Sequence, residues 1–293
     1  MEVKAMKNQI PRKNDSAPID DRSSALPAAS VVLAAGKGSR MTGYDGCKAL
    51  LPLLPGKNPF EGRCPILIHI LESLPSGPAA LVVHHRKDQV IEQTAGLSLT
   101  YCEQPVLNGT GGGLLAARRF LQQNAAAGIL ITMGDVPLVT RETYSRLIQA
   151  IEDVHMAVLA FAPADKKRYG LLEVDGHSVK RIVEWEYWHR YTANQKENLY
   201  LCNSGIYAVR GATLLDYLPV IESRPHRVTK HLEGVDTLVE EYFITDLVEY
   251  LNRDGREVGY LLAAEEQEVM GVDDPEALEK VQRLYAERCG TPD

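Results

Sequence analysis

The strongest constraint on the fold is a regular alternation of strand-like and helix-like segments between residues 31 and 161. Short apolar runs with strand character are each followed by a segment whose apolar residues recur at helical spacing. Such βαβ units with short connections form a mainly parallel sheet with helices on both faces, so we predict a Rossmann-like α/β fold. Strands are predicted at 31–35, 79–84, 97–102, 128–133 and 155–161, and helices at 65–74, 86–94, 112–122 and 141–153, the last with Thr140 as its N-cap.

The pattern changes after about residue 165. Asp175-Gly176 separates two runs of strand character and is typical of a hairpin turn, so we predict an antiparallel element inserted into the sheet. Strands are predicted here at 169–174, 178–184, 200–209 and 257–263, and helices at 240–251 and 275–287. Residues 1–28 are polar and are predicted to be a disordered tail, followed by one domain, 29–293, with an early part, 29–165, and a late part, 166–293.

The composition excludes several classes of protein. The net charge is −7 and the pI is about 5.7, whereas a nucleic-acid binder normally has a basic domain. The five cysteines form no CxxC pair, which is typical of a reducing compartment rather than of a disulfide framework or a zinc site. No apolar run approaches the roughly 20 residues that span a bilayer, and the N-terminus lacks the apolar segment of a secretory signal. We therefore expect a cytoplasmic protein without a nucleic-acid or membrane partner.

One loop carries the clearest chemical signal. An apolar strand leads into Gly36-Lys-Gly-Ser-Arg-Met41, whose glycines let backbone N–H groups approach an anion while Lys37 and Arg40 add positive charge. The loop is not a P-loop, because a glycine rather than Ser or Thr follows Lys37. It is not a dinucleotide fingerprint either, because Met41 stands in the place of the third glycine or alanine. A surface loop with ordinary solubilising charges is the alternative.

Further polar side chains follow other predicted strands, and the carboxyl ends of strands are where open parallel sheets bind ligands. Lys48 follows Arg40 closely enough to face the same phosphates. Gln104 can both donate and accept, as reading a base edge requires, and residues 109–113 lead into a helix N-terminus that suits an anion or a hydroxyl. Asp135 ends a strand, where its carboxylate could hold Mg²⁺. A surface lysine, a flexible turn and a turn-forming aspartate are the alternatives.

The late part carries three further candidates. Glu184 ends an apolar strand, Asn203 lies inside one, and Asp273 precedes the last predicted helix. A buried Asn needs a hydrogen-bond partner, which is usually the backbone, and Asp273 could simply cap the helix. The histidines are dispersed and indicate no zinc site, and His84 and His85, which follow a strand, are interpreted as surface or core residues.

The order of these candidates resembles that of a known family. The matching segments are Leu33-Ala-Ala-Gly-Lys-Gly-Ser-Arg-Met41, Lys48, Gln104, Gly109-Thr110, Gly134-Asp135, Tyr169-Gly170, Ile182-Val-Glu184, Asn203-Ser-Gly205, Glu241-Tyr-Phe-Ile-Thr-Asp246 and Gly271-Val-Asp273. Over residues 29–288 they resemble the sugar-1-phosphate nucleotidylyltransferases, and within them the uridylyltransferase domain of the bacterial N-acetylglucosamine-1-phosphate uridylyltransferases. We expect the nucleotide-diphospho-sugar transferase fold, without the hexapeptide-repeat acetyltransferase domain of the two-domain members.

The resemblance implies transfer of UMP from UTP to a sugar-1-phosphate such as N-acetylglucosamine-1-phosphate, with Mg²⁺ as cofactor, in a cytoplasmic enzyme of cell-envelope polysaccharide biosynthesis. The early part would hold the nucleotide and the late part the sugar. The implied roles are catalysis for Arg40, Lys48 and Asp135; nucleotide binding for Leu33, Ala34, Gly36, Gln104 and Gly109; sugar binding for Thr110, Gly170, Glu184 and Asn203; and metal binding for Asp135 and Asp273.

Three positions depart from the family. Asp273 stands where the family typically has Asn, Met133 where it often has Tyr, and Trp185-Glu-Tyr-Trp188 where a basic residue often follows Glu184. These departures leave the sugar open. One alternative is a cytidylyl- or guanylyltransferase of the same fold that acts on an alcohol phosphate or molybdopterin. Another is a non-catalytic sugar-nucleotide-binding protein, although the presence of Lys48 argues against it.

Overall fold

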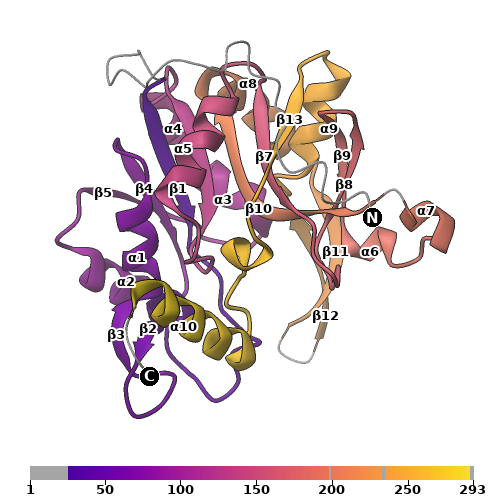
Figure 1. Ribbon diagram of the computed structural model, residues 1–293. Helices are drawn as coiled ribbons and strands as arrows, with labels where there is room; N and C mark the ends of the chain where they lie inside the picture. The colour runs from indigo at the N-terminus through magenta and orange to yellow at the C-terminus, as the bar shows by residue number, and fades with distance from the viewer. Residues whose placement is uncertain (1–25, 198, 233–234, 291–293) are drawn as a thin grey trace, which may run out of the picture.

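A nine-stranded sheet forms the centre of the computed structural model, which describes residues 26–197, 199–232 and 235–290 (Figure 1). The strand order is β5-β4-β1-β6-β10-β7-β13-β9-β8. β5, β4, β1 and β6 are parallel to one another, and β10 is antiparallel to both β6 and β7. The strands are β1 (Ala28–Leu33), β4 (Ala79–Val83), β5 (Leu99–Glu103), β6 (Gly128–Met133), β7 (Met156–Phe161), β8 (Leu171–Asp175), β9 (Ser178–Val183), β10 (Leu201–Arg210) and β13 (Val258–Leu262).

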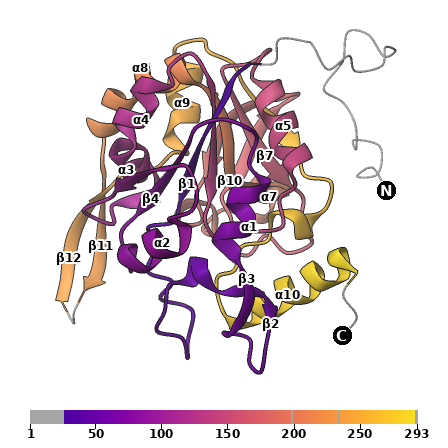
Figure 2. The same cartoon turned by 90° about the vertical axis from the view of Figure 1, so that its left-hand side faces the viewer.

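Helices cover both faces of the sheet, so each face has its own apolar core (Figure 2). Along β1, Val32 belongs to one core while Ala29 and Val31 belong to the other, because successive side chains of a strand point to opposite faces. One core includes α1 (Ile66–Ser73), α2 (Lys87–Thr94), α5 (Arg141–Ala150) and α10 (Pro275–Cys289); the other includes α3 (Gly109–Ala116), α4 (Arg118–Gln123), α8 (Gly211–Glu222) and α9 (Asp246–Arg253).

Two antiparallel hairpins lie outside the main sheet, and β8 and β9 form a third within it. The pair β11–β12 extends away from the body in both views (Figures 1 and 2). The remaining elements are β2 (Pro52–Pro55), β3 (Gly62–Pro65), β11 (His226–Leu232), β12 (Val235–Glu241), the short helices α6 (Trp185–Trp188) and α7 (Ala193–Glu197), and the 3₁₀ turns Lys48–Leu50 and Glu266–Val269.

Two predicted helices have wrong boundaries. The segment 240–251 is not one helix, because Glu240 and Glu241 belong to β12 and α9 begins at Asp246. The alternating residues of β12 pair with β11, for example Val239 with Val228, and this pairing overrides the helical spacing. The segment 112–122 begins earlier, at Gly109, and is interrupted at Ala117, whose ψ of 5° lies outside the helical range.

The predicted tail and the predicted early and late parts can be compared with the structure. The predicted tail, 1–28, lies outside the described residues except for 26–28, and Ala28 is already the first residue of β1. Strands from the predicted early and late parts belong to the same sheet, since β10 lies between β6 and β7. Within the described ranges, no helix is both long and apolar enough to cross a membrane.

Candidate active site

The loop that follows β1 is held between the ends of two neighbouring strands. Ala34 N–H donates to the Val82 carbonyl at 3.0 Å, and Gly134 N–H donates to the Leu33 carbonyl at 2.9 Å. A Cβ on Gly134 would lie 2.7 Å from the Ala34 Cβ, so only glycine allows β6 to end this close to β1. The predicted phosphate loop and the predicted metal ligand Asp135 therefore leave the sheet side by side.

The four residues with predicted roles at the phosphates and the metal meet in one charged cluster. Lys48 Nζ lies 2.5 Å from Asp135 Oδ2 and 3.6 Å from Asp273 Oδ1, and Arg40 Nη2 lies 2.8 Å from the same Asp273 oxygen. The Lys48 side chain is only 13% exposed, whereas that of Arg40 is 68% exposed. Arg40 is thus the member that solvent, or a ligand, reaches most easily.

Backbone contacts fix the positions from which these side chains project. Val272 N–H donates to the Asp135 carbonyl at 2.8 Å, so the segments that carry Asp135 and Asp273 are joined directly. Gly38 has a φ of +64°, and a Cβ there would lie 3.0 Å from the Lys48 Cβ, so the loop folds tightly over Lys48. Asp274, not Asp273, is the N-cap of α10, since it accepts from Ala277 N–H at 2.8 Å. Asp273 therefore remains available to the cluster.

The donor set of this cluster fits Mg²⁺ that arrives with a phosphate ligand. No group of three or more His, Cys, Asp or Glu side chains in the described part of the chain is arranged to hold a metal. Mg²⁺ commonly takes one or two carboxylates and completes its octahedron with substrate phosphates and water. Asp135 and Asp273 would supply such a pair, and both carboxylates lie within ion-pair distance of the Lys48 ammonium.

The side chain of Gln104, which is predicted to read the base, makes hydrogen bonds within its own loop. It is 5% exposed, and its Nε2 donates to Asn108 Oδ1 at 3.0 Å and to the Gly109 carbonyl at 3.1 Å. Both amide donors therefore already have partners, and a base edge would meet the Oε1 acceptor instead. Gly109 has a φ of +88°, and a Cβ there would lie 2.4 Å from the Tyr242 carbonyl oxygen. Glycine is needed at this position.

Three of the four predicted sugar-binding residues lie together. Asn203 N–H donates to the Gly170 carbonyl at 2.8 Å, and a Cβ on Gly170 would lie 3.3 Å from Glu184 Oε2. The Asn203 amide donates to the Tyr207 hydroxyl at 2.7 Å, which satisfies this partly buried side chain. The fourth residue, Thr110, is set apart from them.

Segment 244–245 joins Thr110 to the other three. The Thr110 hydroxyl accepts from Ile244 N–H at 3.2 Å, and the next residue, Thr245, donates its hydroxyl to Glu184 Oε1 at 2.7 Å. Sequence reasoning did not assign roles to Thr245 or Tyr207. Thr245 lies in the matching segment 241–246, so a hydroxyl in a family motif was the signal that could have identified it.

Two carboxyl groups, Glu184 in this set and Asp246 at the same cleft, have raised pKa values. Burial raises the pKa of Glu184, with the Thr245 hydroxyl acting in the opposite direction. Burial also raises the pKa of Asp246, against the influence of His226, whose Nε2 lies 2.7 Å away. Both groups border a cleft of about 590 Å³ that is also lined by tyrosines and arginines.

Tyr169 is influenced by charges of the cluster and adjoins the Glu184 group in sequence. Its pKa is raised by burial first and then by the charge of Asp273, and the adjacent residue is Gly170. Its carbonyl accepts from the Trp188 Nε1–H at 2.8 Å, so Trp188 packs the loop. A ligand that spans the two groups would pass Tyr169.

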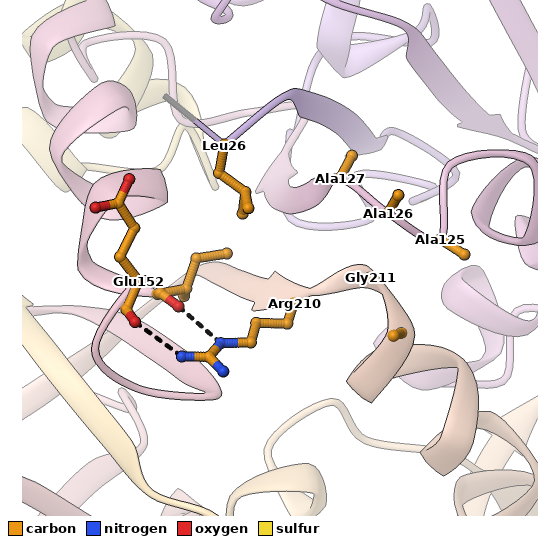
Figure 3. Close-up of a pocket in the computed structure, with 9 residues that line it drawn as sticks. Leu26, Ala125, Ala126, Ala127, Glu152, Arg210 and Gly211 are labelled. Atoms are coloured by element: carbon orange, nitrogen blue, oxygen red, sulfur yellow. Dashed lines mark hydrogen bonds between the residues drawn. The ribbon is translucent and has the colours of Figure 1, made fainter. Parts of the chain in front are cut away.

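A second cavity lies at the other end of the central strands, where β6 begins. Figure 3 shows this space of about 490 Å³, lined by Leu26, residues 125–127 and Arg210. Arg210 is not free there, because it donates to the carbonyls of Ile151 and Glu152 at 2.8 and 2.9 Å. The cavity borders the start of β6, while the charged cluster borders its end, so a six-residue strand of roughly 20 Å separates them.

Solved nucleotidyltransferases have this fold. The UDP-N-acetylglucosamine pyrophosphorylase of Trypanosoma brucei superimposes with a TM-score of 0.66 at 14% identity, covering 87% of this chain and 65% of that one. A putative glucose-1-phosphate thymidylyltransferase of Bacillus anthracis superimposes with a TM-score of 0.63 at 18% identity, covering 88% and 95%. Identities this low show the fold alone. The chain therefore has the fold of solved nucleotidyltransferases.

Sequence comparison assigns the family. Residues 30–221 match the family model of the MobA-like NTP transferase domain, and the chain belongs to this family. The bifunctional protein GlmU of Sphingopyxis alaskensis is 34% identical over 236 residues, which are 78% of this chain and 46% of that one. GlmU of Paramagnetospirillum magneticum is 32% identical over 250 residues, 84% and 49% of the two chains. The chain spans about half the length of these relatives, and the predicted family resemblance is confirmed.

Proposed function

We propose that this chain transfers UMP from UTP to a sugar-1-phosphate and releases pyrophosphate. One observation supports the proposal most directly. Beside a glycine-rich loop, at the carboxyl ends of the parallel strands, ion pairs join four side chains: Lys48, Asp135, Asp273 and Arg40. The similarity to GlmU proteins and to a UDP-N-acetylglucosamine pyrophosphorylase favours a hexosamine-1-phosphate, N-acetylglucosamine-1-phosphate in particular.

The chemistry requires no nucleophilic side chain. A phosphate oxygen of the acceptor, already ionised, attacks the α-phosphorus in line; one P–O bond forms, and the bond to the β-phosphate breaks with its electron pair leaving on pyrophosphate. The main barrier is the approach of two anions, which fixed positive charge lowers. Arg40 and Lys48 would orient and neutralise these phosphates. Mg²⁺ held by Asp135 and Asp273 would supply further charge neutralisation.

The second group of residues supports a polyhydroxylated acceptor. The Gly170 backbone, the Glu184 carboxyl and the second N–H of the Asn203 amide lie together and could bind ring hydroxyls, while the first N–H and the oxygen of that amide are used by Tyr207 and Gly205. Tyr169 links this group to Asp273, so an acceptor could place its phosphate at the charged cluster and its ring beside Glu184. The late part of the chain would thus bind the sugar, and Thr110 would act through segment 244–245.

The direct test measures pyrophosphate release with UTP, CTP, GTP and ATP against a panel of hexose-1-phosphates, phosphocholine and molybdopterin. We expect the fastest release with UTP and an N-acetylhexosamine-1-phosphate, and loss of release when Mg²⁺ is chelated. An Asp135→Asn variant tests whether the release arises from this site. The matched control is Asp175→Asn, which changes an exposed turn aspartate in the β8–β9 hairpin.

Each other outcome selects a different function. Release with phosphocholine or molybdopterin, and with no sugar phosphate, would indicate the cytidylyl- or guanylyltransferase alternative. Tight binding of a UDP-sugar without release for any pair would indicate the non-catalytic alternative. Release that survives in Asp135→Asn would separate the activity from the proposed site.

A further inference from the structure

Two of the five cysteines can be reached by solvent, and both lie beside the same tyrosine. Cys47, Cys102 and Cys202 are buried. Burial raises the pKa of each of these three thiols, which keeps them protonated and unreactive. Cys64 is partly exposed and Cys289 is exposed. These two thiols are therefore the ones that an oxidant in solution can reach.

Tyr285 of α10 brings the two accessible thiols together. Cys64 Sγ lies 3.3 Å from the Tyr285 hydroxyl, although the two residues are 221 positions apart in sequence. Cys289 follows Tyr285 by four positions on the same helix, and side chains at this spacing lie on one face. The pKa of Tyr285 is raised by burial first and then by hydrogen bonds with Cys64 and Cys289, so its hydroxyl is a partner of both thiols. Two sulfur atoms that reach one oxygen lie only a few ångströms from each other.

The surrounding elements hold Cys64 and Tyr285 in place but leave Cys289 free to move. Cys64 lies in β3, which pairs with β2, and its φ of 60° is in the left-handed region that residues other than glycine seldom adopt. The Tyr285 ring packs edge-on against the ring of His69 in α1, with centroids 4.9 Å apart. Cys289 is the last residue of α10, which Gly290 caps with a φ of 65°. Because helix ends fray, the final approach of the two sulfurs requires movement of Cys289 alone.

We infer that Cys64 and Cys289 form a reversible disulfide bond when an oxidised small-molecule thiol, such as glutathione disulfide, is present. The exposed Cys289 thiolate attacks one sulfur of glutathione disulfide, so that a mixed disulfide forms and one glutathione leaves as its thiolate. The Cys64 thiolate then attacks Cys289 Sγ, which forms the protein disulfide and releases the second glutathione. The two protein thiols lose two protons and two electrons in all, and these reduce one glutathione disulfide to two glutathiones.

The bond would join α10 covalently to the β2–β3 hairpin. The turn that begins at Lys48 leads into β2, and Asp273 lies just before α10, so the joined elements adjoin two members of the charged cluster. Gln282 of α10 already donates to a carbonyl of β2, so the bond strengthens an existing contact. The closed loop is longer than the 221 positions between Cys64 and Tyr285, and closing a long loop costs the unfolded chain more entropy than closing a short one. The oxidised protein should therefore be the more stable form.

The test uses the wild-type protein at low concentration in buffers that hold fixed ratios of glutathione to glutathione disulfide. Free thiols are then blocked with a maleimide in denaturant, and the intact mass and the proteolytic peptides are measured. We expect a pair of peptides joined through Cys64 and Cys289, two fewer blocked thiols, and reversal by dithiothreitol. The oxidised protein should also melt about 5–10 °C above the reduced protein. No nucleotide or acceptor is present, so this result does not depend on the proposed activity.

Two variants and a control locate the bond. Cys64→Ser and Cys289→Ser should each abolish the bond and the melting shift, and should leave the remaining accessible cysteine joined to one glutathione. The control Cys102→Ala removes a buried thiol and should retain both the bond and the shift.

Three results would overturn the inference. In the first, both accessible thiols of the wild type remain free at every ratio, or each carries its own glutathione. In the second, Cys289 links two copies of the chain instead of bonding to Cys64. In the third, the oxidised and reduced proteins melt at the same temperature. All three are measured on the wild type, so they remain decisive even if a variant fails to fold.

Discussion

Lys48 connects two carboxylates that come from distant segments of the chain. Its ammonium lies 2.5 Å from Asp135 and 3.6 Å from Asp273, and it is largely shielded from solvent. Without it the two carboxylates would repel each other at short range. One lysine therefore both assembles the pair and keeps a positive charge where the phosphates would bind.

The two carboxylates should differ in importance. We expect Asp135→Asn to lower kcat at least about 100-fold, because its carboxylate is the closer to Lys48 and is the member of the pair that matches the family motif. Asp273→Asn should keep kcat within about fivefold, because the resembled family typically has Asn at this position, where the amide oxygen serves as the oxygen ligand. Steady-state kinetics with UTP and the best acceptor would measure both, and equal losses would contradict this division.

The raised pKa of Glu184 predicts how stability varies with pH. The folded protein retains this proton at pH values, above the usual 4.5, where the unfolded chain has already lost it. The contribution of Glu184 to the free energy of unfolding should therefore be largest at low pH and fall as the pH rises through the raised pKa, with a slope of at most about 1.4 kcal/mol per pH unit.

Glu184→Gln tests this dependence, because it keeps the shape of the side chain and cannot ionise. Urea denaturation between pH 4 and 8 should give a flatter profile for the variant than for the wild type. Asp246, whose pKa is also raised, remains in both proteins, so the difference reports the ionisation of Glu184 together with its interaction with the Asp246 charge. Parallel profiles would show that Glu184 is not the group responsible.

At the scale of elements, replacing glycine by alanine should have different effects on stability and on UTP binding in two loops. Gly109→Ala places a Cβ 2.4 Å from the Tyr242 carbonyl at a φ of +88°, so we expect the free energy of unfolding to fall by about 1–3 kcal/mol. Gly36 has open space around it, so Gly36→Ala should leave stability unchanged and weaken UTP binding, because the methyl group would occupy the space of a phosphate.

Gly96→Ala is the control for both variants. This turn is remote in sequence from the phosphate loop, and a Cβ on Gly96 would also have no neighbouring atom within 4 Å. Chemical denaturation and calorimetry with UTP would separate the two effects. A stability loss in Gly36→Ala equal to that in Gly109→Ala would mean that the phosphate loop is a packing element rather than a ligand loop.

The sequence pattern alone predicts the bounds of a strand or helix when the apolar residues of that element itself mark which of its side chains are buried. β6 has the predicted bounds 128–133, because every residue up to Ile131 is an apolar or glycine position buried at the centre of the sheet. The helix α8 could not be predicted from its residues, because it begins at Gly211 and contains Pro219, which are both typical breakers. It forms because it packs its apolar side against the core that it shares with α3 and α4.

At the scale of the whole molecule, the last helix supports the segment that carries Lys48. Gln282 is 4% exposed, and its Nε2 donates to the carbonyls of Pro52 and Pro59, each at 2.8 Å. Gln282→Ala would leave both carbonyls without this donor, so we expect the free energy of unfolding to fall by about 2 kcal/mol. Urea denaturation measures the loss, and Glu279→Ala, on the exposed side of the same helix, should change it little.

The residues of the candidate site could be predicted, but their contacts could not. The carboxyl ends of parallel strands meet at one edge, so Arg40, Lys48 and Asp135 could be placed there from the sequence pattern. The pairing of Arg40 with Asp273 joins residues 233 positions apart, and no local pattern encodes it. It depends on the strand order and on the Val272–Asp135 backbone contact, which exist only in the folded sheet.

The distance along the chain between Arg40 and Asp273 has a consequence during synthesis. At about 5–20 residues per second, more than about ten seconds pass between the emergence of these two residues from the ribosome. For most of that interval β13 is also absent, although its place is inside the sheet between β7 and β9. Until β13 is synthesised, the edges of β7 and β9 that it later joins lack this partner, and unpaired strand edges in a nascent chain are sites of aggregation that chaperones protect.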